Sequence, residues 1–205
     1  RLSWKLDLIA QVEARVHAAP ESLQTLLARA PEDRAYRRVT VQGQFNHDAE
    51  TRVQAVTELG GGYWVLTPLT TPEGQVLLVN RGFVPAERAD PQTRPQGQVT
   101  GPVSVTGLVR LTEPGGAFLR SNDPAANRWY SRDVQAIAAA RGLGQVAPVF
   151  LDADAAPVPG GVPVGGLTVI AFRNTHLIYA LTWFALAAIA AAGLVLLRRD
   201  RGRGR

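Results

Sequence analysis

Residues 63–84 read YWVLTPLTTPEGQVLLVNRGFV, and this stretch decides the fold class of the chain. It contains two apolar runs, Tyr63–Leu69 and Gln75–Val84, which are separated by TPEG at residues 71–74. Proline in the second place and glycine in the fourth is typical of a type I turn. The stretch therefore predicts two strands joined by a tight turn, and the unbroken VLLV segment favours a central position for the second strand.

Further strand-like runs lie on both sides of this hairpin. They are Tyr36–Phe45, Thr51–Leu59, Val99–Leu111 and Val146–Leu151. The glycine run at residues 60–62 predicts a turn after Leu59. In the run 99–111, Gly101, Pro102 and Gly107 favour bulges or an edge position.

Helical patterns flank these strands. An amphipathic repeat covers residues 2–17, a short helical patch covers Leu23–Arg29, and Asp133–Ala140 reads as a helix that is closed by Gly142. Residues 155–166 are rich in proline and glycine and predict a linker loop. The fold class that we expect is α+β, with an antiparallel β-sheet that curls toward a barrel and carries flanking helices.

An uncharged apolar segment lies near the C-terminus. Leu177–Leu197 reads LIYALTWFALAAIAAAGLVLL, with Thr182 as its one strongly polar side chain. As a helix this segment would be about 31 Å long, which matches the hydrocarbon core of a bilayer. Arg198 and Arg199 follow at once, so we expect a transmembrane helix with a cytoplasmic C-terminus. The alternative is a buried core helix of a water-soluble protein.

These patterns divide the chain into four parts. We expect a juxtamembrane amphipathic helix and linker at 1–30, a β-rich extracytoplasmic domain at 31–172, a transmembrane helix at 173–197 and a basic cytoplasmic tail at 198–205. The first 30 residues lack the apolar core of a signal peptide, and the sequence contains no Met. We therefore expect an upstream transmembrane helix or cleaved signal.

The composition excludes several classes of function. Residues 198–205 hold five Arg and one Asp, so most of the net charge of +5 lies in a tail on a nearly neutral body, and we expect no nucleic-acid partner. The absence of Cys and Met removes disulfides, thiolate nucleophiles and thiolate or thioether copper ligands. Asp152 and Asp154 lie at the end of a predicted strand, where we expect a solvated turn and not a cation site. We expect His17 and His47 to have structural roles. No catalytic motif occurs in the sequence, so we expect no enzymatic activity.

One histidine stands in a different setting. His176 directly precedes the apolar segment, and Tyr179 and Trp183 follow it by three and seven residues, which places all three on one helix face. An imidazole can bind haem iron as an axial ligand, and an indole ring offers a flat apolar wall to a macrocycle. Arg173 is placed to pair with a haem propionate. The spacing predicts a haem site with His176 as the iron ligand, and an interfacial histidine in an aromatic belt is the alternative.

Six segments together form a more specific pattern than any one of them. They are RLSWKLDLIAQVEARVHAAP (1–20), YRRVTVQGQF (36–45), GGYWVLTPL (61–69), VLLVNRGFVP (76–85), RSNDP…RWY (120–130) and RNTHLIYALTWFALA (173–187). The most specific part is NRG-x-VP, followed far downstream by RN-x-HL-x-YA-x-TWF. On these segments the chain resembles the surfeit locus protein one family of cytochrome oxidase assembly factors, from residue 4 to about residue 186.

The resemblance implies a protein of the bacterial plasma (inner) membrane, with two spans and a large domain on the periplasmic side. It implies binding of haem a and assistance with its insertion into cytochrome c oxidase subunit I. The lipid bilayer and haem a synthase are the further partners that we expect. The family's proposed haem contact falls on His176, and Tyr179 and Trp183 match the same motif. The family's glycine-containing turn falls on Asn80, Arg81 and Gly82, of which we expect the last two to bind a partner.

The chain departs from the family pattern at a few positions. Thr175 stands where Asn is usual, Ile178 where Gln is common, Phe83 where Trp is common and Ala185 where Gly is common. None of these changes removes the proposed ligand.

Two alternatives remain open beside haem handling. The first is a scaffold that docks and stabilises an oxidase assembly intermediate without binding haem, in which Arg81 would matter more than His176. The second is an enzyme that acts on haem O or haem A. Arg81 also has a purely structural interpretation, as a strand-end arginine that pairs with a carboxylate.

Overall fold

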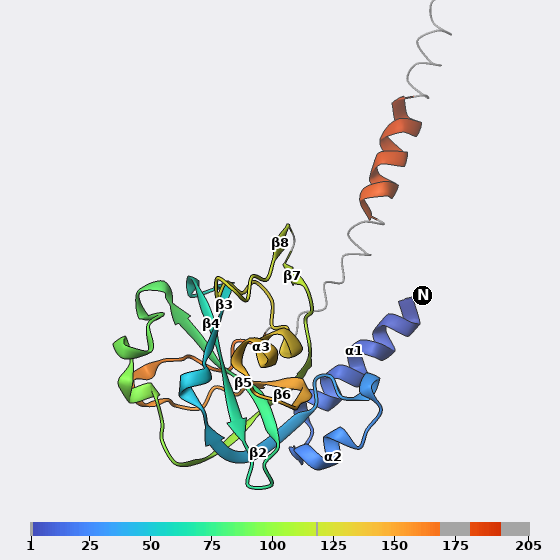
Figure 1. Ribbon diagram of the computed structural model, residues 1–205. Coiled ribbons are helices and arrows are strands. Elements are labelled where there is room, and N and C mark those ends of the chain that lie inside the picture. The colour runs from blue at the N-terminus through green and yellow to red at the C-terminus, as the bar shows by residue number, and fades with distance from the viewer. Residues whose placement is uncertain (1, 118, 169–180, 194–205) are drawn as a thin grey trace, which may run out of the picture. The chain divides into compact units, whose positions relative to one another are not determined.

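The computed structural model describes residues 2–117, 119–168 and 181–193 (Figure 1). The chain divides into two units, residues 1–168 and residues 169–205. Short 3₁₀ segments join the helices and strands of the first unit. These are α1 (Leu2–His17), β1 (Glu21–Ser22), α2 (Leu23–Leu27), β2 (Arg38–Phe45), β3 (Thr51–Thr57), β4 (Gly60–Thr70), β5 (Val76–Pro85), β6 (Pro102–Leu111), β7 (Gly116–Ala117), β8 (Arg120–Ser121), α3 (Val134–Arg141) and β9 (Val146–Ala153).

The main sheet closes on itself. Its seven strands follow the order β1-β2-β6-β9-β5-β4-β3, and β2 also pairs with β4 through Gln44–Thr70 and Phe45–Leu69. This last pairing completes a ring of β2, β6, β9, β5 and β4, with β1 and β3 added outside it. The expected curled sheet is therefore confirmed as a small barrel, in which the pairing of β2 with β4 joins the two ends of the five-stranded ring.

Strand β5 is buried on both faces, which explains its unbroken apolar sequence. Leu77 and Val79 pack in one cluster with residues of β2, β6 and β9, whereas Leu78 packs in a second cluster under α3. Alternate side chains of a strand point to opposite faces, so VLLV supplies both clusters at once. The helix α3 covers the outer face of the barrel (Figure 1) through Ile137 and Ala138.

The sheet is mixed, whereas an antiparallel sheet was expected. Strands β5 and β9 are parallel, as are β1 and β2. The chain between β5 and β9 includes β6 and α3, and such a long crossover allows two strands of one sheet to run in the same direction. Strand β6 is also central, between β2 and β9, so the expected edge position for residues 99–111 is wrong.

The glycine run at residues 60–62 does not form the expected turn. Glu58 and Leu59 make the turn, and all three glycines belong to β4. A Cβ atom on Gly62 would lie 2.2 Å from the carbonyl oxygen of Val84 on the paired strand. A close approach between two backbones therefore explains this glycine.

The predicted helices are confirmed, with small changes at their ends. The side chain of Asp133 caps α3 by accepting a hydrogen bond from the backbone N–H of Ala136 at 3.1 Å. Gly142 ends α3 in the left-handed conformation, at φ 62°. Both signals were readable in the sequence, because Asp at the first cap and Gly at the last have direct physical causes.

The described part of the second unit is helical from residue 181 to residue 193. Its large apolar side chains are mostly exposed: Leu181, Trp183, Phe184, Leu186 and Ile189 each expose more than half of their surface. Within the described ranges, no helix has both the length and the apolar character needed to cross a bilayer. The predicted span at 173–197 extends beyond these ranges at both ends, and it stays a prediction.

Candidate functional site

The residues of the predicted haem site fall mostly outside the described ranges. His176, Tyr179 and Arg173 all belong to residues 169–180, which the structure does not describe. Trp183 lies on the described helix of the second unit and exposes 65% of its surface. An exposed indole on an apolar helix is available to a flat ligand, a lipid or another helix. The geometry of the other three residues stays a prediction.

Arg81 lies in the middle of β5 and is buried, with 6% of its surface exposed. Its guanidinium donates a hydrogen bond to the backbone carbonyl of Gly97 and lies 4.9 Å from the centre of the Phe45 ring. Its Nη1 atom is 3.4 Å from Nδ1 of His47, whose Nε2 atom is 2.8 Å from the carbonyl oxygen of Val99. These contacts hold the segment 97–99 against the barrel, and His47 serves the structural role expected for it.

A bulge in β5 creates the unusual conformation of Gly82. The pairing with β4 runs from Leu66–Asn80 to Trp64–Phe83, so two residues of β5 lie opposite Val65. Gly82 has φ +128°, and a Cβ atom on it would lie 2.1 Å from the carbonyl oxygen of Val164. The structure therefore requires glycine at this position for both conformation and space. The described contacts of Arg81 and Gly82 are internal, and their predicted contact with a partner stays a prediction.

Arg81 belongs to a buried cluster that carries an excess positive charge. Burial lowers the pKa of the Arg81 guanidinium to about 10; the charge of Glu50 opposes this shift and the charge of Arg94 adds to it. Arg94 and Glu50 form a buried ion pair whose side chains are 0% and 4% exposed. Among the described residues no carboxylate forms a salt bridge with Arg81, so the expected strand-end pairing with a carboxylate is wrong.

A second charge cluster surrounds Asp152, which is 3% exposed. Its carboxylate accepts hydrogen bonds from Asn80 Nδ2 at 2.8 Å and Thr168 Oγ1 at 3.0 Å. It also accepts from Arg132 Nη1 at 3.2 Å and lies 3.4 Å from Arg110 Nη1. The expected solvated turn is wrong here, because β9 extends through Asp152 and carries it into the interior. Sequence reasoning missed this cluster, since its five members, Asn80, Arg110, Arg132, Asp152 and Thr168, are far apart in the sequence.

Glu113 extends the Asp152 cluster toward solvent. Burial raises the pKa of the Glu113 carboxyl, but the hydrogen bonds and the charge of Arg132, together with the charge of Arg110, outweigh burial and lower it overall. Burial by itself lowers the pKa of the Arg132 guanidinium. The contacts with Glu113 and Asp152 outweigh burial and raise this pKa overall. The cluster of two arginines and two carboxylates is therefore balanced in charge, unlike the cluster around Arg81.

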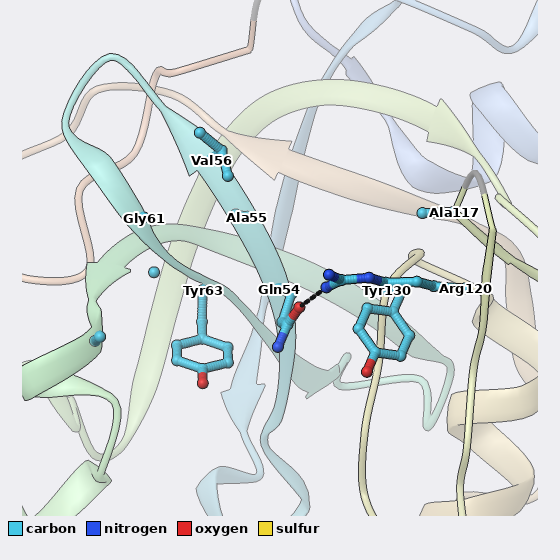
Figure 2. Close-up of a pocket in the computed structure, with 10 residues that line it drawn as sticks. Gln54, Ala55, Val56, Gly61, Tyr63, Ala117, Arg120 and Tyr130 are labelled. Carbon is cyan, nitrogen blue, oxygen red and sulfur yellow. Dashed lines mark hydrogen bonds between the residues drawn. The ribbon is translucent and has the colours of Figure 1, made fainter.

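An open cleft of about 500 Å³ lies between two hairpins of the first unit. Figure 2 shows Gln54 and Val56 of β3, Tyr63 of β4, and Arg120 and Tyr130 around it. Among the described residues, no group of three or more His, Cys, Asp or Glu side chains is placed to hold a metal ion.

The fold and these sites define a class: a small mixed β-barrel with two buried charge clusters, followed by a separate apolar helix. The sequence profile of the SURF1 family matches residues 1–188, which include the barrel and most of the apolar segment. The chain belongs to the SURF1 family.

Similar proteins occur in animals and in a choanoflagellate. The chain is 41% identical over 206 residues to human Surfeit locus protein 1, covering 92% of this chain and 67% of the human one. It is 40% identical over 204 residues to the mouse protein, covering 92% of this chain and 65% of the mouse one. It is 42% identical over 218 residues to the SURF1-like protein of Monosiga brevicollis, covering 98% and 81%. The chain thus spans about two thirds of the length of its mammalian relatives.

Proposed function

We propose that this protein is a non-enzymatic assembly factor for a haem-copper terminal oxidase, cytochrome c oxidase. In this proposal it binds haem a transiently and assists its insertion into cytochrome c oxidase subunit I. Family membership over residues 1–188 carries the proposal, because the matched region includes both the barrel and the RNTHLIYALTWF motif. Haem a is the cargo here, and the haem iron supplies the coordination bond through which a histidine can hold it.

The residues that would hold haem are those of the predicted site. His176 is the proposed axial ligand, Trp183 and Tyr179 form an aromatic wall, and Arg173 pairs with a propionate. The 65% exposure of Trp183 supports this arrangement, because a ring packed into the protein would offer no surface to a macrocycle. The lack of Cys and Met is also consistent with haem as cargo, since copper delivery needs soft ligands.

The proposed location is the bacterial plasma membrane, with the barrel on the periplasmic side and the C-terminus in the cytoplasm. The uncharged segment at 177–197 and the arginines directly after it support this topology. The proposed partners are subunit I, the lipid bilayer and haem a synthase, from which haem a would be received.

The test compares two histidine variants of the full-length protein in detergent. His176→Ala should abolish or strongly weaken haem a binding in a titration that is followed by the Soret band. His17→Ala is the matched control, because His17 is an exposed histidine at the end of α1 and should leave the titration unchanged. Unchanged stoichiometry and spectrum in His176→Ala would remove His176 from the mechanism and favour the scaffold alternative.

A further inference from the structure

Two β-hairpins of the first unit border the cleft of Figure 2. One is the β3–β4 hairpin, whose turn is Glu58–Leu59, and the other is the β7–β8 hairpin. Val56 and Gly61 line the cleft from the first hairpin, and Ala117 and Arg120 line it from the second. The two hairpins therefore form one continuous surface, which we call the hairpin face.

The hairpin face exposes large apolar side chains. Val56 is 89% exposed, Leu59 is 52% exposed and Leu119 is 88% exposed. Among the residues of the first unit whose side-chain exposure the structure describes, 9–117 and 119–168, Leu111 is the one other large apolar residue of this kind, at 43%. Single exposed apolar residues are common on soluble domains, but three on neighbouring hairpins beside an open cleft indicate an interaction surface.

The polar residues of this face are those that favour a membrane interface. Arg120 donates a hydrogen bond to Gln54 Oε1 at 3.1 Å, and its guanidinium carbon lies 5.4 Å from the centre of the Tyr130 ring (Figure 2). Tyr63 lies on the opposite wall of the cleft. Aromatic rings with a polar end, together with arginine, are enriched where a protein meets lipid headgroups. Exposed Glu58 between Val56 and Leu59 limits such a contact to headgroup depth.

The other end of the barrel has the opposite character. Strand β4 has eleven residues, so its two ends are separated by about 33 Å. At the far end, Glu73 lies in the β4–β5 turn, and Gln75, Gln42 and Ser22 line a small hollow beside it. The domain thus has one apolar end and one polar end, which is the arrangement expected of a domain that meets a membrane in a fixed orientation.

The short connection between the first unit and the predicted membrane segment makes a lipid surface the favoured occupant of the hairpin face. Thr168, at the end of the first unit, hydrogen-bonds Asp152, and Glu113, three residues before β7, contacts Asp152 through Arg132. The chain toward the span therefore leaves the barrel close to the base of the β7–β8 hairpin. Eight residues, 169–176, separate the first unit from the uncharged apolar segment at 177–197, and eight residues reach at most about 29 Å when fully extended.

We propose that the hairpin face rests on the membrane surface, with Val56, Leu59 and Leu119 at headgroup depth and Arg120 beside lipid phosphate. This inference rests on the membrane topology that belongs to the proposed function. Its consequence for that function is orientation: the contact would fix which face of the barrel meets the lipid.

Residues 1–205 contain no Cys, so a single cysteine introduced there is the one thiol of this stretch, and any cysteine outside it would be replaced by Ser before labelling. We would attach an environment-sensitive fluorophore to Leu119→Cys and Val56→Cys in the full-length protein, in vesicles of phosphatidylcholine and phosphatidylglycerol with a headgroup-depth quencher. We expect a blue shift and quenching at both positions. Glu73→Cys, at the polar end, is the aqueous control, and Ile189→Cys reports whether the apolar helix is inserted.

The outcomes separate this inference from the topology on which it rests. If Ile189→Cys is quenched by a bilayer-depth quencher while Leu119→Cys and Val56→Cys behave as Glu73→Cys does, the hairpin face is wrong and the span stands. If Ile189→Cys is not quenched, the span itself fails. Shielding of Leu119→Cys from aqueous iodide without lipid quenching would indicate a protein occupant and would also overturn the proposal.

A charge variant provides a second, independent measurement. With the label at Leu59→Cys, the double substitution Leu119→Asp and Val56→Asp should abolish the blue shift, because carboxylates are repelled from an anionic surface and cost free energy to desolvate. Leu111→Asp is the matched control, since it adds a carboxylate at an exposed apolar position away from the hairpin tips, and it should leave the shift intact. All of these positions are exposed, so the fold should tolerate the changes. A shift that survives the double substitution would count against the proposal.

Discussion

Two arginines of the first unit, the buried Arg81 and the partly buried Arg132, each stack on an aromatic ring but have opposite electrostatic surroundings. The guanidinium carbon of Arg132 lies 4.8 Å from the centre of the Phe150 ring, and that of Arg81 lies 4.9 Å from the centre of the Phe45 ring. Stacking on an aromatic face is therefore common to both. The difference between them must come from the charged groups around each guanidinium.

The carboxylates decide that difference. Arg132 bonds both Glu113 and Asp152, and these contacts outweigh burial and raise its pKa. Burial dominates at Arg81, whose pKa falls to about 10 even though the charge of Glu50 opposes the shift. Removing Arg132 breaks its ion pairs and leaves the buried carboxylate of Asp152 poorly compensated. Removing Arg81 breaks no described ion pair. The two sites should respond very differently to the same substitution.

The largest effect is expected for Arg132→Met. This change leaves the buried Asp152 with one weak guanidinium contact, from Arg110 at 3.4 Å, and breaks the link to Glu113. Breaking a buried pair in this way costs about 3–5 kcal/mol of unfolding free energy. Urea unfolding in detergent measures it, and Arg128→Met is the control, because the Arg128–Asp123 pair is largely exposed and should matter little. A loss no larger than that of the control would refute the balanced-cluster interpretation.

A smaller effect is expected for Arg81→Met. The substitution leaves the carbonyl of Gly97 without its guanidinium donor, which costs about 1–3 kcal/mol. It also removes a charge that burial disfavours, and Glu50 keeps its ion pair with Arg94. The same urea titration compares it with Arg132→Met. Equal losses in the two variants would show that Arg81 compensates Glu50 after all, and the contrast between the two arginines would fail.

The sequence predicted those parts of this molecule that depend on neighbouring residues. The end of helix α3 followed from Gly142, which caps it locally, and the central place of β5 followed from the apolar VLLV. Glycines were harder to interpret, because a glycine can be required either by a turn or by a close approach between two strands. The run at 60–62 therefore predicted a turn where the structure has a strand.

Features that depend on long-range pairing could not be read from the sequence. Ring closure requires Phe45 to meet Leu69, and the Asp152 cluster requires Asn80, Arg132 and Thr168 to converge on one carboxylate. No local pattern marks these pairings, since a strand-end Asp and a buried Asp look alike in the sequence. The candidate haem site was the reverse case, in which helical spacing predicted a shared face that falls largely outside the described residues.

A weaker perturbation of the same cluster is Thr168→Val. It keeps the shape of the side chain but removes the hydrogen bond from Thr168 Oγ1 to Asp152 at 3.0 Å. A single hydrogen bond of this kind contributes about 0.5–1.5 kcal/mol. Thr100→Val, at an exposed position, should change nothing measurable. Hydrogen exchange of the backbone amides of β9 is the sensitive measurement. Faster exchange in Thr168→Val alone would show that Thr168 stabilises the Asp152 cluster, and equal exchange rates in the two variants would show that it does not.

The smallest effect is expected from Glu113→Gln and appears as a change in pH dependence. The pKa of Glu113 is lower in the folded protein than its ordinary value of 4.5, so the unfolded state binds more protons between the two values. Stability contributed by Glu113 is therefore fully present above pH 4.5 and is lost as the pH falls through the folded value. About a third of the side chain is in water, which screens the effect. Glu113→Gln should flatten the acid limb of a plot of unfolding free energy against pH. The control Glu73→Gln, in the exposed β4–β5 turn, should leave the slope of that limb unchanged. Parallel curves for the two variants would show that the acid sensitivity of the barrel comes from other groups.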